Sequence, residues 1–306
     1  MLTLESQQEE APMPELPEVE CVKNIITQVA CGRVISAVSV PEPKVIAYPD
    51  PLSFQSGLQG RTITRLSRRG KFILFQLDDA GRLILHLRMT GCLVPSPAAA
   101  PVAKHTHLIL HLGPAGTGLQ TGRDDGKERS RDEQHYDELR YVDPRKFGRF
   151  WYLAPEEEDQ FSGIAALGPE PEQVSADYLA AIFASRHLPV KAALLDQHLI
   201  AGIGNIWSDE ILFRSGIHPL TKVNMINING LQVLADSIHS VISEAIVLNR
   251  STVSAFVKGE GREYSDLTLM NVYGREGQPC KRCGSLIRRL TIGGRSSCFC
   301  PHCQPE

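Results

Sequence analysis

The sequence lacks both a long apolar run and a leader that would direct it into or across a membrane. No stretch approaches the roughly 18 consecutive apolar residues that a membrane-spanning helix requires. No basic segment followed by an apolar stretch opens the chain, so no secretory signal is expected. We therefore expect a cytoplasmic protein with no membrane partner. Its 306 residues, 42% of them hydrophobic, suffice for two or three domains with their own cores.

The sequence also lacks an overall excess of positive charge. The formal net charge is -3 and the isoelectric point is near 6.4, which by itself argues against a nucleic-acid partner. The distribution of the charges favours the opposite conclusion. Residues 1–12 contain three glutamates and no cation, whereas residues 271–306 contain six cations and two carboxylates, a local net charge of +4. Because affinity for DNA depends on local neutralisation of phosphates, this basic module on a neutral body suits DNA contact.

Alternation of strands with helices is absent, which excludes a parallel α/β sheet. The first half contains one helical pattern, with apolar residues between Val19 and Val29 and a terminating Gly32, followed by β patterns. The expected strands are 34–40, 61–66, 72–77, 83–87, 108–112, 139–142 and 150–153, with a hairpin turn at 78–81. The second half is helical, with expected helices at 175–186, 190–197, 205–214 and 230–248. This order predicts an α+β protein with separate β-sandwich and helical domains.

Two polar stretches interrupt these patterns. Residues 113–138 are rich in glycine and charge, and we interpret them as a disordered loop between two strands, without a chemical role. The acidic stretch 156–159 and the Gly-Pro-Glu-Pro-Glu stretch 168–172 indicate a linker between the domains.

Disulfide frameworks are not expected in a cytoplasmic chain, so the eight cysteines favour a metal site. Four of them form two Cys-x2-Cys pairs separated by 16 residues, which is the spacing of a zinc ribbon. Four thiolates close the coordination sphere, so one zinc ion would be structural and not catalytic. The ligands would be Cys280, Cys283, Cys300 and Cys303, with Cys298 a packed or free thiol.

The stretch 13–20 joins an unusual nucleophile to carboxylates at the start of a helix. If Met13 were the initiator and were removed, Pro14 would carry a free secondary amine. Such an amine can attack a sugar C1′ and form an iminium. An α-amino group, with a reference pKa of roughly 8, is partly unprotonated at neutral pH. Alternatively, Pro14 and Pro17 form only a turn and the first turn of a helix.

Several further stretches each have a structural and a functional interpretation. Lys71 precedes a buried strand and could either belong to an exposed edge or turn inward toward a phosphate or carboxylate. Met89 and Phe147 could be core residues, or apolar wedges that enter an unstacked base step. The Gly-Ile-Gly-Asn stretch ending at Asn205 describes an anion site at a helix N-terminus, or a close packing turn. Arg295, in a turn expected at 293–297 with two serines, suits a phosphate clamp, or a solvated surface.

Taken together, residues 13–304 resemble the formamidopyrimidine-DNA glycosylase family in the order and spacing of six stretches. These are Met-Pro-Glu-Leu-Pro-Glu-Val-Glu at 13–20, Gly-Lys-Phe at 70–72, Arg-Met-Thr-Gly at 88–91, Asp-Pro-Arg-Lys-Phe-Gly at 143–148, Gly-Ile-Gly-Asn-Ile-Trp-Ser-Asp-Glu at 202–210 and the cysteine pairs. The resemblance implies an N-terminal β-sandwich domain with a leading helix that faces a helix-two-turns-helix domain bearing a zinc-ribbon β-hairpin. DNA would lie between them.

The resemblance further implies domain limits, an activity and partners. The expected parts are an extension at 1–13 outside the mature enzyme, a catalytic β-sandwich domain at 14–155, a linker at 156–174, a helix-two-turns-helix domain at 175–265 and a zinc-ribbon finger at 266–306. The implied activity is that of a DNA glycosylase and abasic-site lyase of base excision repair. It would remove 8-oxoguanine and formamidopyrimidines and cut the strand by β,δ-elimination. We expect a monomer that binds double-stranded DNA with an oxidised base or abasic site, and that associates with the nucleoid through DNA.

The catalytic roles implied by the resemblance fall on five residues. Pro14 would be the Schiff-base nucleophile at C1′, and Glu15 the proton donor that helps to open the deoxyribose, with Glu18 supporting the site. Lys71 would be the proton donor for β-elimination and Arg295 for δ-elimination. Flipping the nucleotide out of the stack would expose C1′ to these groups.

The resemblance also implies DNA-binding positions. Four match the family's DNA contacts, three match the residues that fill the gap left by the extruded base, and residues 258–269 match its base-recognition loop. The first four are His105, Arg145, Arg186 and the phosphate-binding Asn205, and the three are Met89, Arg145 and Phe147.

Two departures from the family pattern affect these expectations. Residues 113–138 form a longer insertion and involve no catalytic position. Residues 1–12 precede Met13, and if they are retained the Pro14 nitrogen is an amide that cannot form an iminium. We expect Met13 to be the true start; otherwise the extension is trimmed, or the enzyme is silenced and acts as a non-catalytic damage-binding protein. Two further functions compatible with the sequence are an endonuclease VIII-type enzyme for oxidised pyrimidines and a zinc-ribbon interaction protein.

Overall fold

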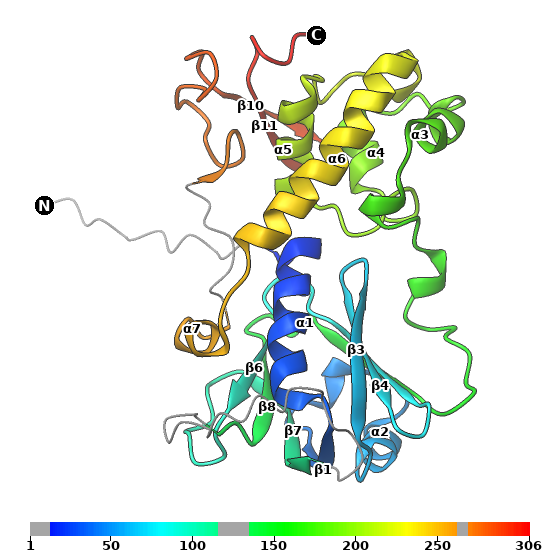
Figure 1. Cartoon of the computed structure of the whole chain (residues 1–306), viewed down its shortest axis with the longest axis vertical. Coiled ribbons are helices and arrows are strands. Elements are labelled where there is room, and N and C mark those ends of the chain that lie inside the picture. Colours follow the sequence, from blue (N-terminus) through cyan, green and yellow to red (C-terminus); the bar gives the residue numbers. More distant parts are fainter. Residues whose placement is uncertain (1–12, 116–134, 262–268) are drawn as a thin grey trace, which may run out of the picture.

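A computed structural model describes residues 13–115, 135–261 and 269–306. These residues form two lobes, with β-sheets in the lower lobe and helices in the upper lobe of Figure 1. Helix α1 (Leu16–Ala30) begins at the junction of the lobes and runs down into the lower one. Its N-terminal Leu16 packs in the core of the helical lobe, whereas Val19, Val22 and Ile26 pack in the core of the β lobe. The start of α1 is therefore held by both lobes.

The lower lobe is a sandwich of two sheets, in agreement with the predicted β-sandwich with a leading helix. The four-stranded sheet has the order β1 (Arg33–Ser39), β7 (Thr106–Ala115), β8 (Glu138–Val142) and β6 (Cys92–Ser96). The five-stranded sheet has the order β2 (Ile46–Tyr48), β9 (Arg149–Leu153), β5 (Arg82–His86), β4 (Phe72–Leu77) and β3 (Ile63–Arg69). The predicted hairpin is β4 and β5, which pair antiparallel from Phe72 opposite His86 to Gln76 opposite Arg82.

Four elements of the β lobe have no counterpart in the sequence prediction: α2 (Pro51–Leu58), α7 (Val253–Lys258) and the strands β2 and β6. Each has eight residues or fewer, too short for its periodicity to be recognised. The two ends of the predicted loop 113–138 belong to strands in the structure, because β7 continues to Ala115 and β8 begins at Glu138. Residues 116–134, most of that loop, lie outside the described residues.

The upper lobe contains the helices α3 (Ala176–Phe183), α4 (Val190–Leu195), α5 (Asn205–Ser215) and α6 (Ile228–Leu248). Their ends follow local rules. The Ser175 hydroxyl caps α3 by accepting from the Tyr178 N–H at 3.1 Å, and Gly216 ends α5 with a φ of 69°. Helix α6 is long and apolar enough to cross a membrane by length and composition, but its buried face packs in the helical core. After α6 the chain returns to the β lobe, where Phe256 of α7 joins the core.

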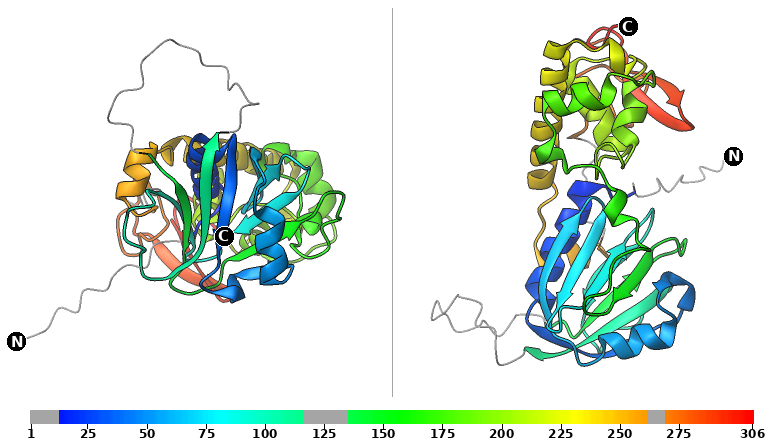
Figure 2. Two further views of the ribbon diagram at one scale, coloured as in Figure 1. Left: turned by 90° about the horizontal axis from the view of Figure 1, so that it is seen from below. Right: turned by 90° about the vertical axis from the view of Figure 1, so that its right-hand side faces the viewer.

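The C-terminal module is an antiparallel hairpin of β10 (Arg288–Ile292) and β11 (Arg295–Phe299), preceded and followed by cysteine turns. In the right-hand view of Figure 2 this hairpin, in red, projects from the helical lobe on the side opposite α6, in yellow. Strand β11 packs against α5. The 3₁₀ segments η1 (Pro43–Val45), η2 (Ile164–Ala166), η3 (Pro171–Gln173) and η4 (Val223–Met225) lie in the connections.

Candidate functional site

The carboxylate of Glu15 lies at the N-terminus of α5. Glu15 is the N-cap of α1 and forms a reciprocal capping box with Glu18, whose carboxylate accepts from the Glu15 N–H at 2.9 Å. Across the lobe junction, the backbone N–H groups of Ile206 and Trp207 donate to the Glu15 carboxylate, with N···O distances of 2.9 and 3.3 Å. The group at this helix start, where the sequence predicts an anion site, is thus the protein's own Glu15 side chain.

The two glycines before α5 permit this contact. A Cβ at Gly204 would lie 2.2 Å from the Glu15 Cδ, and one at Gly202 would lie 2.4 Å from the Leu16 Cδ1. Gly202 also has a φ of 86° and accepts a hydrogen bond from the Leu16 N–H at 3.1 Å. Both interpretations of the Gly-x-Gly stretch are therefore partly right, because the close packing turn creates the anion site.

Glu18 connects three helices and is fully buried. Its carboxylate accepts from the indole Nε1–H of Trp207 at 3.2 Å and from the amide of Asn249 at 3.1 Å. These bonds tie α1 to the first turn of α5 and to the end of α6, in agreement with a supporting role. Asn249 was not expected from the sequence, because it follows an apolar helix and carries no motif.

The turn that precedes Lys71 is fixed by contacts with Glu170. Gly70, with a φ of 55°, forms the tight turn between β3 and β4, and its N–H donates to Glu170 at 2.7 Å. Arg68 and Arg69 also pair with Glu170, at 2.6 and 2.8 Å. This turn is thereby anchored to the linker. Lys71, which follows the turn, is half-buried, and the influence of Glu15 on its pKa favours the interpretation that it turns toward a carboxylate.

Lys71, Glu15 and Arg295 come from three distant segments, and Glu15 and Arg295 lie close enough to Lys71 to influence its pKa. Burial lowers the pKa of Lys71; the Glu15 carboxylate opposes this shift and the Arg295 cation adds to it. Burial likewise raises the pKa of Glu15, against the attraction of Lys71 and with a further increase from the nearby Glu18. A carboxyl group that holds its proton and an ammonium that releases its proton more readily are suited to acid–base work near neutral pH.

Pro14 is buried beside Glu15, immediately before α1. The predicted extension lies, apart from Met13, outside the described residues.

Met89, Arg145 and Phe147 meet at one end of the sandwich. The Arg145 Nη1 lies 3.8 Å from the Met89 Sδ, and the Met89 and Phe147 side chains are 40% and 49% exposed. Apolar side chains this exposed do not belong to the core, so the interpretation as core residues is wrong for both. His105, with a φ of 67°, lies beside them, and its carbonyl accepts from the Asp143 N–H at 3.0 Å.

Asp143 holds these loops together, which the sequence did not predict. Its fully buried carboxylate accepts from the Thr90 hydroxyl, the Tyr141 hydroxyl at 2.9 Å, and the N–H groups of Gly148 and Arg145 at 2.9 and 3.1 Å. Burial opposes its ionisation, but these hydrogen bonds outweigh burial and lower the pKa of Asp143. The Asp-Pro-Arg-Lys-Phe-Gly stretch is thus a rigid base for its own exposed tip.

Replacing Asp143 with Ala should destabilise the protein by about 3 kcal/mol or more at pH 7, since each buried donor left unpaired costs about 1–3 kcal/mol. Because the folded pKa is lowered, the stabilisation is present above the unfolded value of about 3.9 and is lost as the pH falls through the folded pKa. Urea unfolding at pH 7 and in acid should therefore show a difference that shrinks in acid. The exposed Asp236→Ala serves as control and should change stability by less than about 0.5 kcal/mol. Equal effects of the two substitutions would contradict this role of Asp143.

Arg295 begins β11, directly after a two-residue turn. Gly293 and Gly294 have φ values of 55° and 77°, as a tight hairpin turn with two left-handed positions requires. The predicted turn 293–297 is therefore too long, since Ser296 and Ser297 lie in the strand. The Ser297 hydroxyl donates to Asp209 at 2.7 Å and is not available to clamp a phosphate.

A buried ion pair holds the hairpin against α5. Lys191 and Asp209 are 0% and 1% exposed and lie 2.5 Å apart, and Asp209 also accepts from Ser297 and from the Cys298 N–H at 2.9 Å. Burial raises the pKa of Asp209, and the contact with Lys191 opposes that shift. The sequence did contain an indication of this ion pair. Lys191 lies within the apolar segment Val190–Leu195, and a buried cation requires a partner.

The neighbouring Glu210 anchors the entry to the finger. Its carboxylate accepts from the backbone N–H groups of Asn271, Val272 and Tyr273 at 2.9 to 3.0 Å. Tyr273 in turn hydrogen-bonds the Asn205 side chain, and the Asn205 Oδ1 is buried with no partner among the described residues. Asn205 thus retains an unused acceptor close to Glu15.

The four predicted zinc ligands converge. The Sγ atoms of Cys280, Cys283, Cys300 and Cys303 all lie within 4.8 Å of one another. A tetrahedral zinc with Zn–S bonds of about 2.3 Å would separate sulfurs by about 3.8 Å, so the cluster fits the ion. The N–H groups of Arg282 and Cys303 lie 3.4 Å from ligand sulfurs. Cys298 is buried outside the cluster, as a packed thiol.

Arg186 is the remaining predicted DNA-binding residue. It is exposed after α3, and its guanidinium donates to the Ile182 carbonyl. Within the described ranges, no hydrogen bond or ion pair links it to the other site residues. Of the predicted base-recognition loop 258–269, residues 262–268 lie outside the described part of the chain.

Comparison with known proteins extends over nearly the whole chain. Three family models match: the formamidopyrimidine-DNA glycosylase N-terminal domain at residues 13–150, the H2TH domain of the same enzyme at 166–257, and the zinc finger found in FPG and IleRS at 277–305. They cover the β lobe, the helical lobe with α7, and the cysteine hairpin.

Curated relatives and solved structures agree. The formamidopyrimidine-DNA glycosylase of Moorella thermoacetica is 42% identical over 282 residues, 91% of this chain and 94% of the relative. That of Bacillus subtilis is 38% identical over 96% of this chain and 100% of the relative. A structure of the Lactococcus lactis Fpg with DNA containing an abasic site has a TM-score of 0.81 at 30% identity, over 96% of this chain and 100% of that one. A complex of the same enzyme with DNA containing FAPY-dG gives the same TM-score and identity over 95% of this chain. These matches and the site geometry agree: the chain belongs to the formamidopyrimidine-DNA glycosylase family.

Proposed function

We propose that this protein is a DNA glycosylase and abasic-site lyase of base excision repair that removes oxidised purines from double-stranded DNA. The observation that carries the proposal is the convergence of Glu15, Lys71 and Arg295, from α1, the β3–β4 turn and the finger hairpin, beside Pro14. Their meeting at the lobe junction is what a multi-step reaction at one sugar requires.

Pro14 is the proposed nucleophile. The lone pair of its nitrogen forms a bond to C1′ of the damaged nucleotide, and the C1′–N bond to the base breaks, with the electron pair leaving on the base. The proton that the Pro14 nitrogen then loses neutralises the departing base. Glu15 then protonates the ring oxygen as the C1′–O bond opens, which leaves an iminium between Pro14 and C1′. The raised pKa of Glu15 supports this donor role, because the carboxyl group keeps its proton to higher pH than an ordinary glutamate does.

Strand cleavage follows from the same iminium. Loss of the C2′ proton breaks the C3′–O bond, and a second elimination breaks the C5′–O bond. We assign Lys71 as proton donor in the first elimination and Arg295 in the second, and the lowered pKa of Lys71 supports its release of a proton.

The exposed cluster of Met89, Arg145 and Phe147 is suited to fill the gap left by the flipped nucleotide. Flipping costs a few kcal/mol, and apolar side chains that replace the base in the stack offset that cost. Asp143 contributes by keeping the two wedge loops in contact without itself touching DNA. His105 and Arg186 remain proposed DNA contacts, and Asn205 remains a proposed phosphate contact.

The proposed substrates follow the chemistry of the relatives' complexes. The Lactococcus lactis Fpg has been solved with DNA containing an abasic site, a FAPY-dG and an oxidised pyrimidine. We propose damaged duplexes of the first two kinds as substrates here, with oxidised pyrimidines as a second class. We further propose that the protein acts as a cytoplasmic monomer, associated with the nucleoid through DNA, and that one zinc ion holds the finger.

The proposed chemistry requires a free amine on Pro14, whereas in the 306-residue chain this nitrogen is joined to Met13. Two preparations test the requirement, one that begins at Pro14 and one that retains residues 1–13. Each is incubated with a duplex containing 8-oxoguanine opposite cytosine and treated with borohydride, which reduces an iminium to a stable amine. We expect a covalent complex only from the first preparation, with peptide mapping that places the DNA on Pro14.

The remaining outcomes distinguish the competing functions. Failure of the Pro14 preparation to form any covalent complex, on either this duplex or one with an abasic site, would refute the lyase mechanism. Specific lesion binding without a covalent complex would identify a damage-binding protein. Faster trapping on a duplex with an oxidised pyrimidine would reverse the assigned substrate order.

A further inference from the structure

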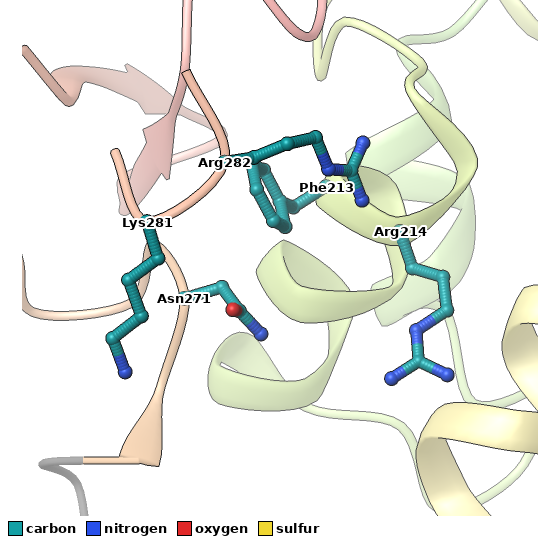
Figure 3. Close-up of a pocket in the computed structure, with 5 residues that line it drawn as sticks. All are labelled: Phe213, Arg214, Asn271, Lys281 and Arg282. Carbon is teal, nitrogen blue, oxygen red and sulfur yellow. The ribbon is translucent and has the colours of Figure 1, made fainter. Parts of the chain in front are cut away.

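A second binding feature lies at the other end of α5, between that helix and the finger. It is a pocket of about 310 Å³ lined by Phe213, Arg214, Asn271, Lys281 and Arg282. Figure 3 shows the side chains around it, with Arg214 on the helix and Lys281 and Arg282 on the turn between the first two cysteines. No step of the proposed reaction uses these residues.

Among the described residues, the charged side chains that line this pocket are all positive. Arg214, Lys281 and Arg282 are exposed, and each belongs to the lining. Two carboxylates of the described part of the chain contact its lining residues. Glu210 is buried and occupied by backbone N–H groups, and Glu244 pairs with Arg214 at 2.7 and 2.6 Å. The surface presented to a ligand therefore carries an excess of positive charge.

The cations are also held in position. The bidentate pair with Glu244 orients Arg214, and the Arg282 guanidinium carbon lies 4.6 Å from the centre of the Phe213 ring, in cation–π contact. The Lys281 Nζ donates to the Leu269 carbonyl at 3.2 Å. An ammonium has three donors and a guanidinium five, so these groups can bind oxygen anions in addition to their present contacts. Little side-chain entropy would be lost on binding, which favours affinity.

The pocket is separate from the proposed catalytic site. Asn205 and Arg214 stand nine positions apart on α5, which at 1.5 Å per residue places them about 13 Å apart along the helix axis. The pocket borders α6 through the Arg214–Glu244 pair, whereas the β10–β11 hairpin that carries Arg295 projects on the side away from α6 (Figure 2). DNA held by Arg295 and Asn205 would thus approach a different side of the helical lobe.

We propose that this pocket is a docking site for an acidic segment of a partner protein, whose Asp and Glu carboxylates pair with Arg214, Lys281 and Arg282. Guanidinium forks match carboxylates in bidentate geometry, and a cationic patch raises the rate of encounter with an acidic partner. Its location away from the proposed DNA side favours a protein partner over a nucleic-acid strand. Such docking would leave the lobe junction open, so the partner could be bound during repair.

A direct binding measurement tests this proposal without any reference to enzyme activity. The probe is a fluorescein-labelled peptide of four Asp-Glu repeats, and fluorescence anisotropy at about 0.1 M salt reports its affinity. The pocket variant Lys281→Glu/Arg282→Glu is compared with Lys44→Glu/Lys222→Glu, which makes the same charge change at exposed positions elsewhere. We expect the pocket variant to lose about tenfold or more in affinity, equivalent to about 1.4 kcal/mol, and the control to stay near the wild type.

A second variant shows whether any loss of peptide affinity results from damage to the zinc-binding turn. Arg214→Gln lies on α5 and leaves the cysteine turn intact, so it should weaken the peptide in the same direction while metal analysis still finds one zinc per chain. Equal peptide affinity in the pocket variants and the control would overturn the proposal. So would an unchanged peptide affinity together with weaker binding of an abasic duplex, which would assign these cations to the DNA interface.

Discussion

Replacing Glu15 with Gln should lower base excision by about 10²–10⁴-fold, the usual contribution of a positioned proton donor. Gln has nearly the same shape, and its carbonyl can still accept from the Ile206 N–H, which makes the shorter of the two contacts, so the protein should remain folded. What is lost is the proton that the raised pKa of Glu15 retains. Single-turnover excision on a duplex with 8-oxoguanine opposite cytosine, by protein that begins at Pro14, measures the effect.

The pH dependence of the excision rate tests whether Glu15 acts in its protonated form. Because burial raises the pKa of Glu15, the active protonated form persists to higher pH, and excision should decline as the pH rises through that value. Glu15→Gln should lack this decline. Glu172→Gln, at an exposed position, is the matched control and should excise like the wild type. Retention of full excision by Glu15→Gln would remove Glu15 from the reaction and leave it only as a cap for α1.

Replacing Cys300 with Ser should release the zinc and unfold the finger while the β lobe stays folded. Zinc binding supplies about 10–16 kcal/mol of apparent folding free energy in isolated zinc-finger peptides, and the finger's own buried cluster is small. The β lobe has a separate core that does not include the cysteine turns. Metal analysis should find less than one zinc per chain, and hydrogen exchange should show lost protection confined to the finger and the facing side of α5.

The functional consequence follows from the position of Arg295. With the hairpin unfolded, Arg295 no longer lies near Lys71, and strand cleavage should stop after the first elimination, with weaker binding of an abasic duplex. Cys31→Ser is the control. Cys31 lies outside the zinc cluster, and a serine hydroxyl can replace its Sγ as donor to the Thr64 carbonyl. Normal zinc content and complete cleavage by Cys300→Ser would show that three thiolates suffice and that the finger's position is set elsewhere.

The limits of prediction from this sequence are visible at particular residues. The hairpin of β4 and β5, the caps at Ser175 and Gly216 and the zinc ligands were predicted because each depends on residues within a few positions or on a fixed spacing. Short elements such as β6 and α7 were missed, since their stability comes from packing on the sandwich and not from their own pattern.

In the candidate site, too, the sequence predicted local features but not the contacts between distant residues. The glycines at 202 and 204 predicted a close approach at a helix start, but not that Glu15, almost 190 positions earlier in the chain, would be the group that approaches. The serines after Arg295 were interpreted as phosphate ligands, yet Ser297 donates to the buried Asp209. Asp143 begins the motif at 143–148, but nothing in the sequence indicated that its carboxylate would hold the wedge loops together.

The sequence by itself determined the zinc ribbon, the order of the sandwich and helical lobes, and the family, because spacing, periodicity and motif order are properties of the chain. Only the tertiary structure decided which groups act on one another. Glu15, Lys71 and Arg295 acquire their altered electrostatics from burial and mutual proximity, and the cationic pocket exists only where the finger meets α5. Charge interactions depend on distance and on exclusion of water, and both are set when distant segments pack together.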